Sequence, residues 1–475
     1  MGKKLEAEKL EVKNDKRLCR AGAFPILASS FLLLASVCLA FWGVWNHQFV
    51  AWDDNYNVYD NPRVQQGLTP GNAAWAVTSM EGGNWFPATW ISWMAFGTNP
   101  RAQHLANLAL HAANAVLVFL ILLRIVPQSS KGANSALPLP PDVTPSGSEG
   151  SALRLFSAFL AAAIFALHPL RAESVAWVSG RTDLLAAFFA LAAILCYLRD
   201  LRPLALFLFA LAVMSKSSAV APLPFAMAFL VWVFPFQHRR LEYLSSFAAM
   251  AAGGALLQGM ARSLHGSVIA LPLLQRAGNM AASYASFVGK AIWPANLSPA
   301  YPLRLVSWQM GFAAFLLLGG ITLLLALQVR RGRSELLIGW IWFLMMLGPF
   351  VGAFQAIEET VADRYTYLPL LGLIVPAAWL LSQSDLGLAF GGVAALSLFV
   401  AVGAQAQYWR DSRTLFSRAV AATSDNYKMH NQLGYLASKA GRHEEAVREF
   451  QESIRIAPGY TLATSNLLYE LKHGE

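Results

Sequence analysis

Charged residues are scarce in this sequence. Only 13% of the 475 residues are Asp, Glu, Lys or Arg, whereas about a quarter is usual in soluble domains. Together with 56% hydrophobic residues, this shortage excludes an ordinary soluble globular protein. Cysteine is scarcer still, because the chain has only Cys19, Cys38 and Cys196, without CxxC spacing. Neither a disulfide framework nor a zinc site is therefore expected, and these side chains should pack as small apolar groups.

Apolar runs fill most of the chain instead, and the longest have the roughly 20 residues needed to cross about 30 Å of hydrocarbon. Eleven such runs cover residues 24–45, 103–125, 154–167, 183–199, 203–214, 219–236, 244–261, 309–329, 335–354, 367–382 and 387–405. The stretch 279–293 is expected to be interfacial or re-entrant, because counting it would place the basic residues 330–333 outside. The sequence therefore predicts an all-α, polytopic membrane protein with about 11 transmembrane helices.

The distribution of basic residues predicts the orientation. Threading the runs alternately puts the Lys- and Arg-rich breaks and the basic N-terminus, residues 1–23, on the cytoplasmic side. The Pro-, Ser- and Gly-rich linker 127–153 is then cytoplasmic, and the Trp-rich loop 46–102 is outside, where it suits a helix lying at the membrane surface. The net charge of +9 is attributed to loop orientation and to anionic membrane lipids, so no nucleic-acid partner is expected.

The transmembrane domain, 24–407, is followed by a polar tail, 408–475. Within 427–460 the positions of Leu433, Gly434, Ala446, Phe450 and Pro458 match the 34-residue tetratricopeptide repeat (TPR). A generic helical hairpin is the alternative. Because one full repeat is fewer than the three or so needed for independent stability, the tail is expected to pack on the membrane domain or on a partner.

Polar residues near hydrocarbon usually mark function, and the threading places several groups of them on the outer face. These are Asp53 and Asp54; His168, Arg171 and Glu173; Arg181 and Asp183; Lys216; and Glu358, Glu359, Asp363 and Arg364. A carboxylate of the first group can act as a general base. The cations Arg171, Arg181, Lys216 and Arg364 suit phosphate oxygens. This convergence predicts a site for an anionic, lipid-linked substrate.

Each group also has a structural alternative. Asp53 and Asp54 could cap a turn, Arg171 could pair with Glu173, and Lys216 could extend to lipid headgroups. A polar stripe of His104, Asn107, His111 and Asn114 shares one face of the second span. Hydrogen bonds between helices explain that stripe at least as well as substrate contact does.

A family resemblance rests on several of these segments. They are Phe49–Asp54, Asn84–Trp90, His168–Trp177, Gly180–Asp183 and Asp363–Pro369, which contains Tyr365 and Tyr367, all followed by the TPR tail. The combination resembles the transmembrane and TPR-containing (TMTC) proteins over nearly the whole chain. The resemblance implies a GT-C glycosyltransferase that moves mannose from a polyprenyl phosphate to Ser or Thr hydroxyls. It also implies that Asp53 and Asp54 are the acidic motif, with Asp53 favoured as the base, and that Arg364 lies near the donor.

The sequence therefore predicts an inverting glycosyltransferase that uses a polyprenyl-phosphate-linked sugar and a protein acceptor, which the TPR tail could help to bind. Its short tail and compact loops indicate a bacterial inner-membrane protein with the active site and C-terminus periplasmic. No metal-ligand spacing is present, although Asp53 and Asp54 could hold a divalent cation. A lipid-linked sugar flippase and a non-catalytic TPR scaffold are the alternatives. The absence of repeated halves disfavours the first, and the gathered charges disfavour the second.

Overall fold

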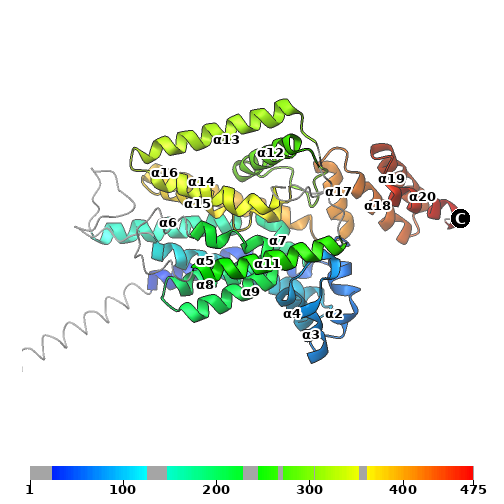
Figure 1. Ribbon diagram of the computed structural model, residues 1–475, viewed down its shortest axis with the longest axis horizontal. Helices are drawn as coiled ribbons and strands as arrows, with labels where there is room; N and C mark the ends of the chain where they lie inside the picture. The colour runs from blue at the N-terminus through cyan, green and yellow to red at the C-terminus, as the bar shows by residue number, and fades with distance from the viewer. Residues whose placement is uncertain are drawn as a thin grey trace, which may run out of the picture.

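The computed structural model describes residues 24–125, 147–227, 244–265, 271–303, 305–351 and 361–473. Every regular element in these ranges is a helix, as the all-α prediction requires (Figure 1). The basic N-terminus, most of the predicted linker, the end of the predicted span 219–236, and Glu358 and Glu359 lie outside the described residues. Helix α6 (Gly147–Leu167) begins inside the predicted linker.

Five described helices are long and apolar enough to cross a membrane. They are α5 (Pro100–Ile125), α9 (Arg202–Val220), Leu244–Ser263 within α11 (Leu244–His265), α13 (Trp308–Val329) and α16 (Asp385–Gln407). A bent pair, Ser151–Leu167 with Pro169–Ala176, would be a sixth, and Phe24–Ala40, Ser334–Phe350 and Leu371–Leu381 are shorter apolar helices. These helices indicate an integral membrane protein.

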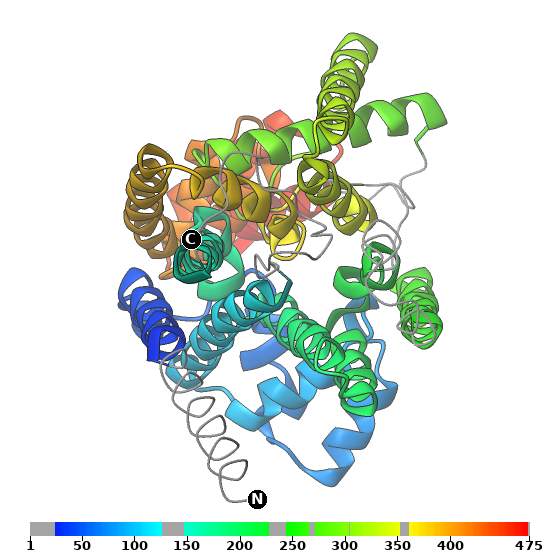
Figure 2. The ribbon, with the colours of Figure 1, turned by 90° about the vertical axis from the view of Figure 1, so that its left-hand side faces the viewer.

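The long helices run roughly alongside one another, lengthwise in Figure 1 and nearly end-on in Figure 2. Only 11% of the apolar stretches of α13 and α16 is buried within the protein, which leaves surfaces suited to lipid. Helix α12 (Leu273–Ile292) runs across the others, because it is seen end-on in Figure 1 and lengthwise in Figure 2. It is not among the candidate spans, in agreement with the interfacial placement expected for 279–293.

Two neighbouring helices of the membrane domain approach closely at glycines. A Cβ atom at Gly339 of α14 (Ser334–Leu347) would lie 2.1 Å from the carbonyl oxygen of Gly372 in α15 (Leu371–Leu381). Small residues allow such contacts between membrane helices, where van der Waals packing must replace the hydrophobic effect. An alanine at either glycine would therefore force α14 and α15 apart.

The loop 46–102 folds into short helices, of which α2 (Pro62–Gln65), α3 (Pro70–Thr78) and α4 (Pro87–Phe96) begin with proline. Proline is favourable there because the first helical N–H groups have no partner within the helix. The Trp90 and Trp93 side chains are fully buried in a small separate core. Trp90 and Trp93 therefore pack within the loop and against Val178, and the expected placement of the loop at the membrane surface stays a prediction.

The tail forms helices α17 (Ser412–Ala422), α18 (Tyr427–Lys439), α19 (His443–Ile456) and α20 (Thr461–His473), which lie at the right of Figure 1. Its α17 and α18 side chains Leu415, Phe416, Ala419, Met429 and Leu433 belong to the same hydrophobic core as the membrane domain. The prediction that the tail packs on the membrane domain is confirmed.

Candidate functional site

Glu173 and Arg364 form a buried ion pair. Glu173 lies in α7 (Ala172–Ala176), and Arg364 lies in the 3-10 helix η7 (Asp363–Thr366). Glu173 Oε1 accepts a hydrogen bond from Arg364 Nη1, and Glu173 Oε2 accepts one from the Arg364 backbone N–H at 2.9 Å. The side chains are 2% and 13% exposed. The expected alternative, a Glu173–Arg171 pair, is wrong, because Arg364 occupies both oxygens that Glu173 offers.

Lys216 forms a second ion pair where α9 is interrupted. Its extended backbone, with φ −163° and ψ 91°, kinks the helix, and its Nζ donates to Asp183 Oδ2 at 2.7 Å. Asp183 lies in the first turn of α8 (Arg181–Tyr197). The Tyr365 ring is 5.9 Å from Lys216 Nζ and 5.0 Å from Arg364 Cζ. The two ion pairs therefore adjoin through one aromatic ring, which a cation can approach favourably.

A third pair involves Lys290, which was not among the predicted site residues. Lys290 Nζ, at the end of α12, donates to Asp363 Oδ1 at 2.9 Å. The Tyr301 hydroxyl lies 3.0 and 3.1 Å from the two Asp363 carboxylate oxygens. The available signal was a lysine in the last turn of an amphipathic helix, where basic side chains are favourable.

Arg171 and Arg181 are fully buried and face protein groups. The Arg171 guanidinium adjoins the rings of Phe165 and Tyr367, which contact each other edge-on, and its Nη2 donates to the carbonyl and hydroxyl oxygens of Thr366 at 3.1 and 3.2 Å. Its Nε and Nη1 are buried without a hydrogen-bond partner among the described residues. Neither guanidinium is placed at the surface where the sequence prediction put its phosphate contact.

Arg181 connects three helices. Its guanidinium donates to Asn107 Oδ1 at 2.8 Å and to the backbone carbonyl oxygens of Gln103 and Ser92. These acceptors lie on α5 and α4, whereas Arg181 begins α8. With its donors occupied in this way, Arg181 acts as a link between helices. The cations of the three ion pairs described above, Arg364, Lys216 and Lys290, are partly exposed instead.

Asp54 is held inside the protein by three hydrogen-bond donors. Its Oδ1 accepts from the Ser179 backbone N–H at 2.9 Å and hydroxyl at 2.7 Å, and its Oδ2 accepts from the Val50 N–H at 3.1 Å. Burial raises the pKa of Asp54 to about 7, and the three donors partly offset that effect. Asp54 thus connects its loop to the turn before α8. It precedes the short helix Asn55–Tyr59 without a side-chain capping hydrogen bond, so the cap expected as its structural alternative is not formed by Asp54.

Asp53 is exposed and has a left-handed backbone, with φ 67°. Such a conformation is costly for a residue with a Cβ and persists only when neighbouring contacts enforce it. The Asp53 carbonyl accepts from the Asn57 N–H at 2.8 Å, and the Trp52 carbonyl accepts from Trp177 Nε1 at 2.7 Å. The Trp177 ring lies 5.3 Å from Arg364 Cζ. The acidic loop therefore adjoins the cation cluster through Trp177.

The polar stripe of α5 connects helices. His111 Nε2 lies 2.9 Å from the Ala166 carbonyl oxygen and its Nδ1 lies 2.7 Å from the Tyr367 hydroxyl, which also accepts from Asn114 at 3.1 Å. Since the Ala166 carbonyl can only accept, Nε2 carries the proton and Nδ1 accepts from Tyr367. Asn107 donates to the Trp177 carbonyl at 2.7 Å. Hydrogen bonding between helices, the alternative given above for this stripe, is what these contacts show.

Two further predicted histidines also make structural contacts. His104 Nε2 is 3.4 Å from the Gln48 carbonyl oxygen. His168 Nε2 is 3.1 Å from the Ala291 carbonyl oxygen of α12, and its Nδ1 accepts from the Leu170 N–H at 3.3 Å. His168 therefore holds the same end of α12 that carries Lys290.

Asp54 has little remaining capacity for a divalent cation, because both of its carboxylate oxygens already accept hydrogen bonds. Asp53 is exposed. Within the described ranges, no group of three or more His, Cys, Asp or Glu side chains is arranged to hold a metal. Since Mg²⁺ usually keeps several waters and binds through one or two carboxylates together with substrate phosphates, a cation at the acidic pair stays a prediction.

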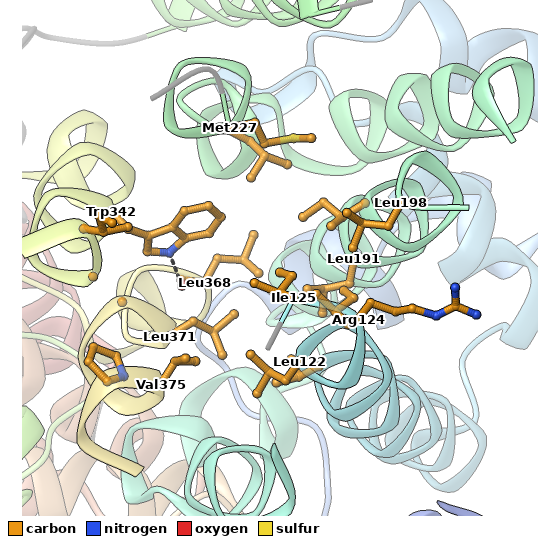
Figure 3. Close-up of a pocket in the computed structure, with 18 of the residues that line it drawn as sticks. Leu122, Arg124, Ile125, Leu191, Leu198, Met227, Trp342, Leu368, Leu371 and Val375 are labelled. Atoms are coloured by element: carbon orange, nitrogen blue, oxygen red, sulfur yellow. Dashed lines mark hydrogen bonds between the residues drawn. The ribbon is translucent and has the colours of Figure 1, made fainter. Parts of the chain in front are cut away.

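An apolar cavity of about 520 Å³ lies between α5, α8, α14 and α15 (Figure 3). Its walls include Leu122, Leu191, Trp342, Leu371 and Val375, whose carbon atoms face the space, whereas the guanidinium of Arg124 points away from it.

The cavity also has Leu368 in its wall, and Trp342 Nε1 donates to the Leu368 carbonyl at 3.2 Å. Leu368 is four residues after Arg364, and the lining residue Ala190 is seven after Asp183, or about 10 Å along α8. One end of the cavity therefore lies near η7, and its other end reaches the last turns of α5 and α8 at Ile125 and Tyr197.

Curated relatives match much of the chain. Protein O-mannosyl-transferase Tmtc3 of Drosophila melanogaster is 24% identical over 454 residues, covering 77% of this chain and 47% of the relative. Protein O-mannosyl-transferase TMTC4 of Homo sapiens is 25% identical over 438 residues, covering 75% and 55%. Protein O-mannosyl-transferase F38B6.6 of Caenorhabditis elegans is 23% identical over 330 residues, covering 64% and 46%.

The chain thus spans about half the length of the curated relatives it matches. No family model and no solved structure matches it. The resemblance to TMTC proteins that the sequence segments indicated is confirmed by these relatives.

Proposed function

With this similarity to TMTC proteins as the premise, we propose that the chain is a GT-C-type protein O-mannosyltransferase. It transfers mannose from a polyprenyl-phosphate donor to a Ser or Thr hydroxyl of an acceptor protein on the outer face of a bacterial inner membrane. The names of the relatives support the transfer of mannose to protein. The donor, the orientation and the residue roles are argued below from the charges and the cavity.

The donor phosphate binds beside Arg364, Lys216 and Lys290. These three cations retain 13%, 18% and 14% side-chain exposure, and each already contacts one carboxylate. A phosphate has several acceptor oxygens, so it can engage more than one of these cations at once. This arrangement supports a donor site at the outer ends of α9 and α12, next to η7.

The polyprenyl chain of the donor occupies the apolar cavity beneath these cations. The cavity volume, about 520 Å³, lies in the range of small-molecule sites, and most of its labelled walls are hydrocarbon, with the Trp342 indole ring, the Met227 thioether and Arg124, whose guanidinium points away. An amphiphile with an anionic head matches a charged rim above an apolar chamber. A soluble nucleotide-sugar donor has no long apolar chain that could fill this cavity.

Asp53 acts as the general base. The acceptor hydroxyl attacks the anomeric carbon of mannose, its proton passes to the Asp53 carboxylate, and the bond to the phosphate oxygen breaks with inversion. The polyprenyl phosphate leaves with its electron pair, and the nearby cations stabilise the negative charge that develops. The observation that supports this role is that exposed Asp53 follows Trp52, whose carbonyl accepts from Trp177, and that the Trp177 ring lies 5.3 Å from Arg364 Cζ.

The membrane arrangement is part of the proposal. The proposal keeps the eleven crossings predicted from the sequence, with the N-terminus cytoplasmic and the tail periplasmic. The tail forms one full TPR with flanking half repeats. Gly434 supports this reading, because a Cβ there would lie 2.6 Å from Phe450 Cε1, so the two helices of the hairpin require glycine. The tail presents the acceptor protein to Asp53.

The test compares Asp53→Asn with Asp60→Asn, an exposed carboxylate seven residues further along the chain. Purified protein in liposomes receives polyprenyl-phosphate mannose with a radiolabelled sugar and a pool of Ser- and Thr-containing peptides. Loss of a positioned base typically costs about 10² to 10⁴ in rate, so Asp53→Asn should nearly abolish transfer, whereas Asp60→Asn should retain it. Full transfer by Asp53→Asn refutes the base. Movement of the labelled lipid across the bilayer without transfer would identify a flippase, and neither activity would identify a scaffold.

A further inference from the structure

The TPR-like tail makes direct backbone contact with the loop that carries Asp53. The Gln48 N–H donates to the Arg410 carbonyl oxygen at 2.9 Å, and the Ala51 N–H donates to Ser412 Oγ at 2.8 Å. The Trp52 ring meets the Phe416 ring edge-on with centroids 6.4 Å apart. The loop that carries Asp53 and the first helix of the tail are therefore joined by hydrogen bonds and packing, although they are about 360 residues apart in sequence.

Ser412 is not needed to cap its own helix. Asp411 precedes α17 and its carboxylate accepts from the Thr414 N–H at 2.8 Å, which is the ordinary N-cap contact. The Ser412 hydroxyl is at the first helical position and accepts instead from Ala51 of the other domain. The contact thus contributes to the loop more than to the helix that supplies it.

The loop is fixed at consecutive residues around the strained position. Contacts from outside the loop reach Ala51 from Ser412, the Trp52 carbonyl from Trp177, and Asp54 from Ser179. Asp53 lies between these anchors with φ 67°. Aspartate tolerates the left-handed region better than most residues with a Cβ, and contacts on both sides of it hold the loop in this conformation. Of these three contacts, the one from Ser412 comes from the tail.

We propose that Ser412 is a positioning residue for Asp53, so that the tail is a structural part of the transfer site as well as an acceptor-binding module. This inference rests on the proposed function, because it assumes that Asp53 is the base. It predicts a defect in the chemical step when the Ser412 hydroxyl is removed, while donor and acceptor still bind.

The experiment compares Ser412→Ala with Ser412→Thr, which keeps the hydroxyl, and with Ser397→Ala. Ser397 is an exposed serine of α16 whose hydroxyl bonds within its own helix. Loss of one hydrogen bond that holds the base should lower kcat roughly 3- to 10-fold with the KM for donor and acceptor unchanged. Ser412→Thr should restore most of the rate, and Ser397→Ala should match the wild type.

Amide hydrogen exchange of the segment 48–57 supplies a readout that does not depend on activity. It should become faster in Ser412→Ala and stay unchanged in Ser397→Ala. Unchanged exchange and kcat in Ser412→Ala would overturn the inference, and so would a loss that appears only in the acceptor KM. If Asp53→Asn retains full transfer, the proposed function fails instead, whatever Ser412→Ala does to exchange.

Discussion

Replacing Glu173 with Gln tests whether the Glu173–Arg364 pair organises the site. The substitution keeps the shape of the side chain but removes the charge that neutralises a guanidinium only 13% exposed. Breaking a buried pair by removing one partner typically costs about 3–5 kcal/mol, because the remaining charge is left uncompensated. The glutamine oxygen can still accept from the Arg364 N–H or from Nη1 but not from both in the present geometry, since its other terminal group is a donor. We expect a loss at the lower end of that range.

The assay is thermal or denaturant unfolding in detergent, with Arg364→Gln and the double variant completing a cycle. The double variant should be less destabilised than the sum of the single variants, because it leaves no unpaired charge. Glu445→Gln is the matched control, since Glu445 pairs with Arg413 at 2.9 Å on the exposed tail surface, where such pairs contribute about 0–1 kcal/mol. A Glu173→Gln loss no larger than that of Glu445→Gln, with additive single variants, would refute the reasoning.

Three other outcomes are expected. Burial raises the pKa of Asp54 to about 7, above its value in the unfolded chain, so the folded state binds more protons between about pH 4 and 7. The free energy of unfolding should therefore fall as pH rises through that window, by at most about 1.4 kcal/mol per pH unit. Asp54→Asn should flatten this slope when unfolding is measured as a function of pH. Ala190→Phe should fill the cavity and abolish the binding of polyprenyl phosphate, measured by lipid pull-down. Leu396→Phe, on the exposed face of α16, should leave binding unchanged. Equal binding by the two variants would refute the assignment of the cavity to the lipid chain. Arg448→Cys, exposed on α19, should react with an impermeant thiol reagent in intact cells when the native cysteines are replaced; labelling that requires permeabilisation would reverse the orientation.

The sequence predicted that the charged residues lie together. Ionised groups beside hydrocarbon are costly, and they are stabilised when they lie close to one another. Glu173, Arg364, Asp183 and Lys216 do lie together. Their pairing was not predictable. Arg171 is two residues from Glu173 in sequence, yet Glu173 binds Arg364, 191 residues away.

The residue type also does not predict whether a charged side chain is buried or exposed. Arginine serves equally well as a phosphate ligand at a surface and as a link between helices inside a bundle, because its fork of donors suits both. Arg181 proves to be such a link, between α8, α5 and α4. The helix boundaries show a related difference, since the separate runs predicted as 203–214 and 219–236 begin as one helix, α9, with Lys216 at its kink.

The pairing of each exposed cation with a carboxylate explains how the site can exist without substrate. Three cations gathered at the edge of the membrane would repel one another and would be costly to desolvate. Asp183, Glu173 and Asp363 each hold one of Lys216, Arg364 and Lys290, so the resting cluster is close to neutral. These pairs also fix the cations before a phosphate arrives, and preorganised charges stabilise a developing anion without further rearrangement. Loss of a carboxylate should therefore impair the chemical step as well as stability, although no carboxylate needs to contact the donor.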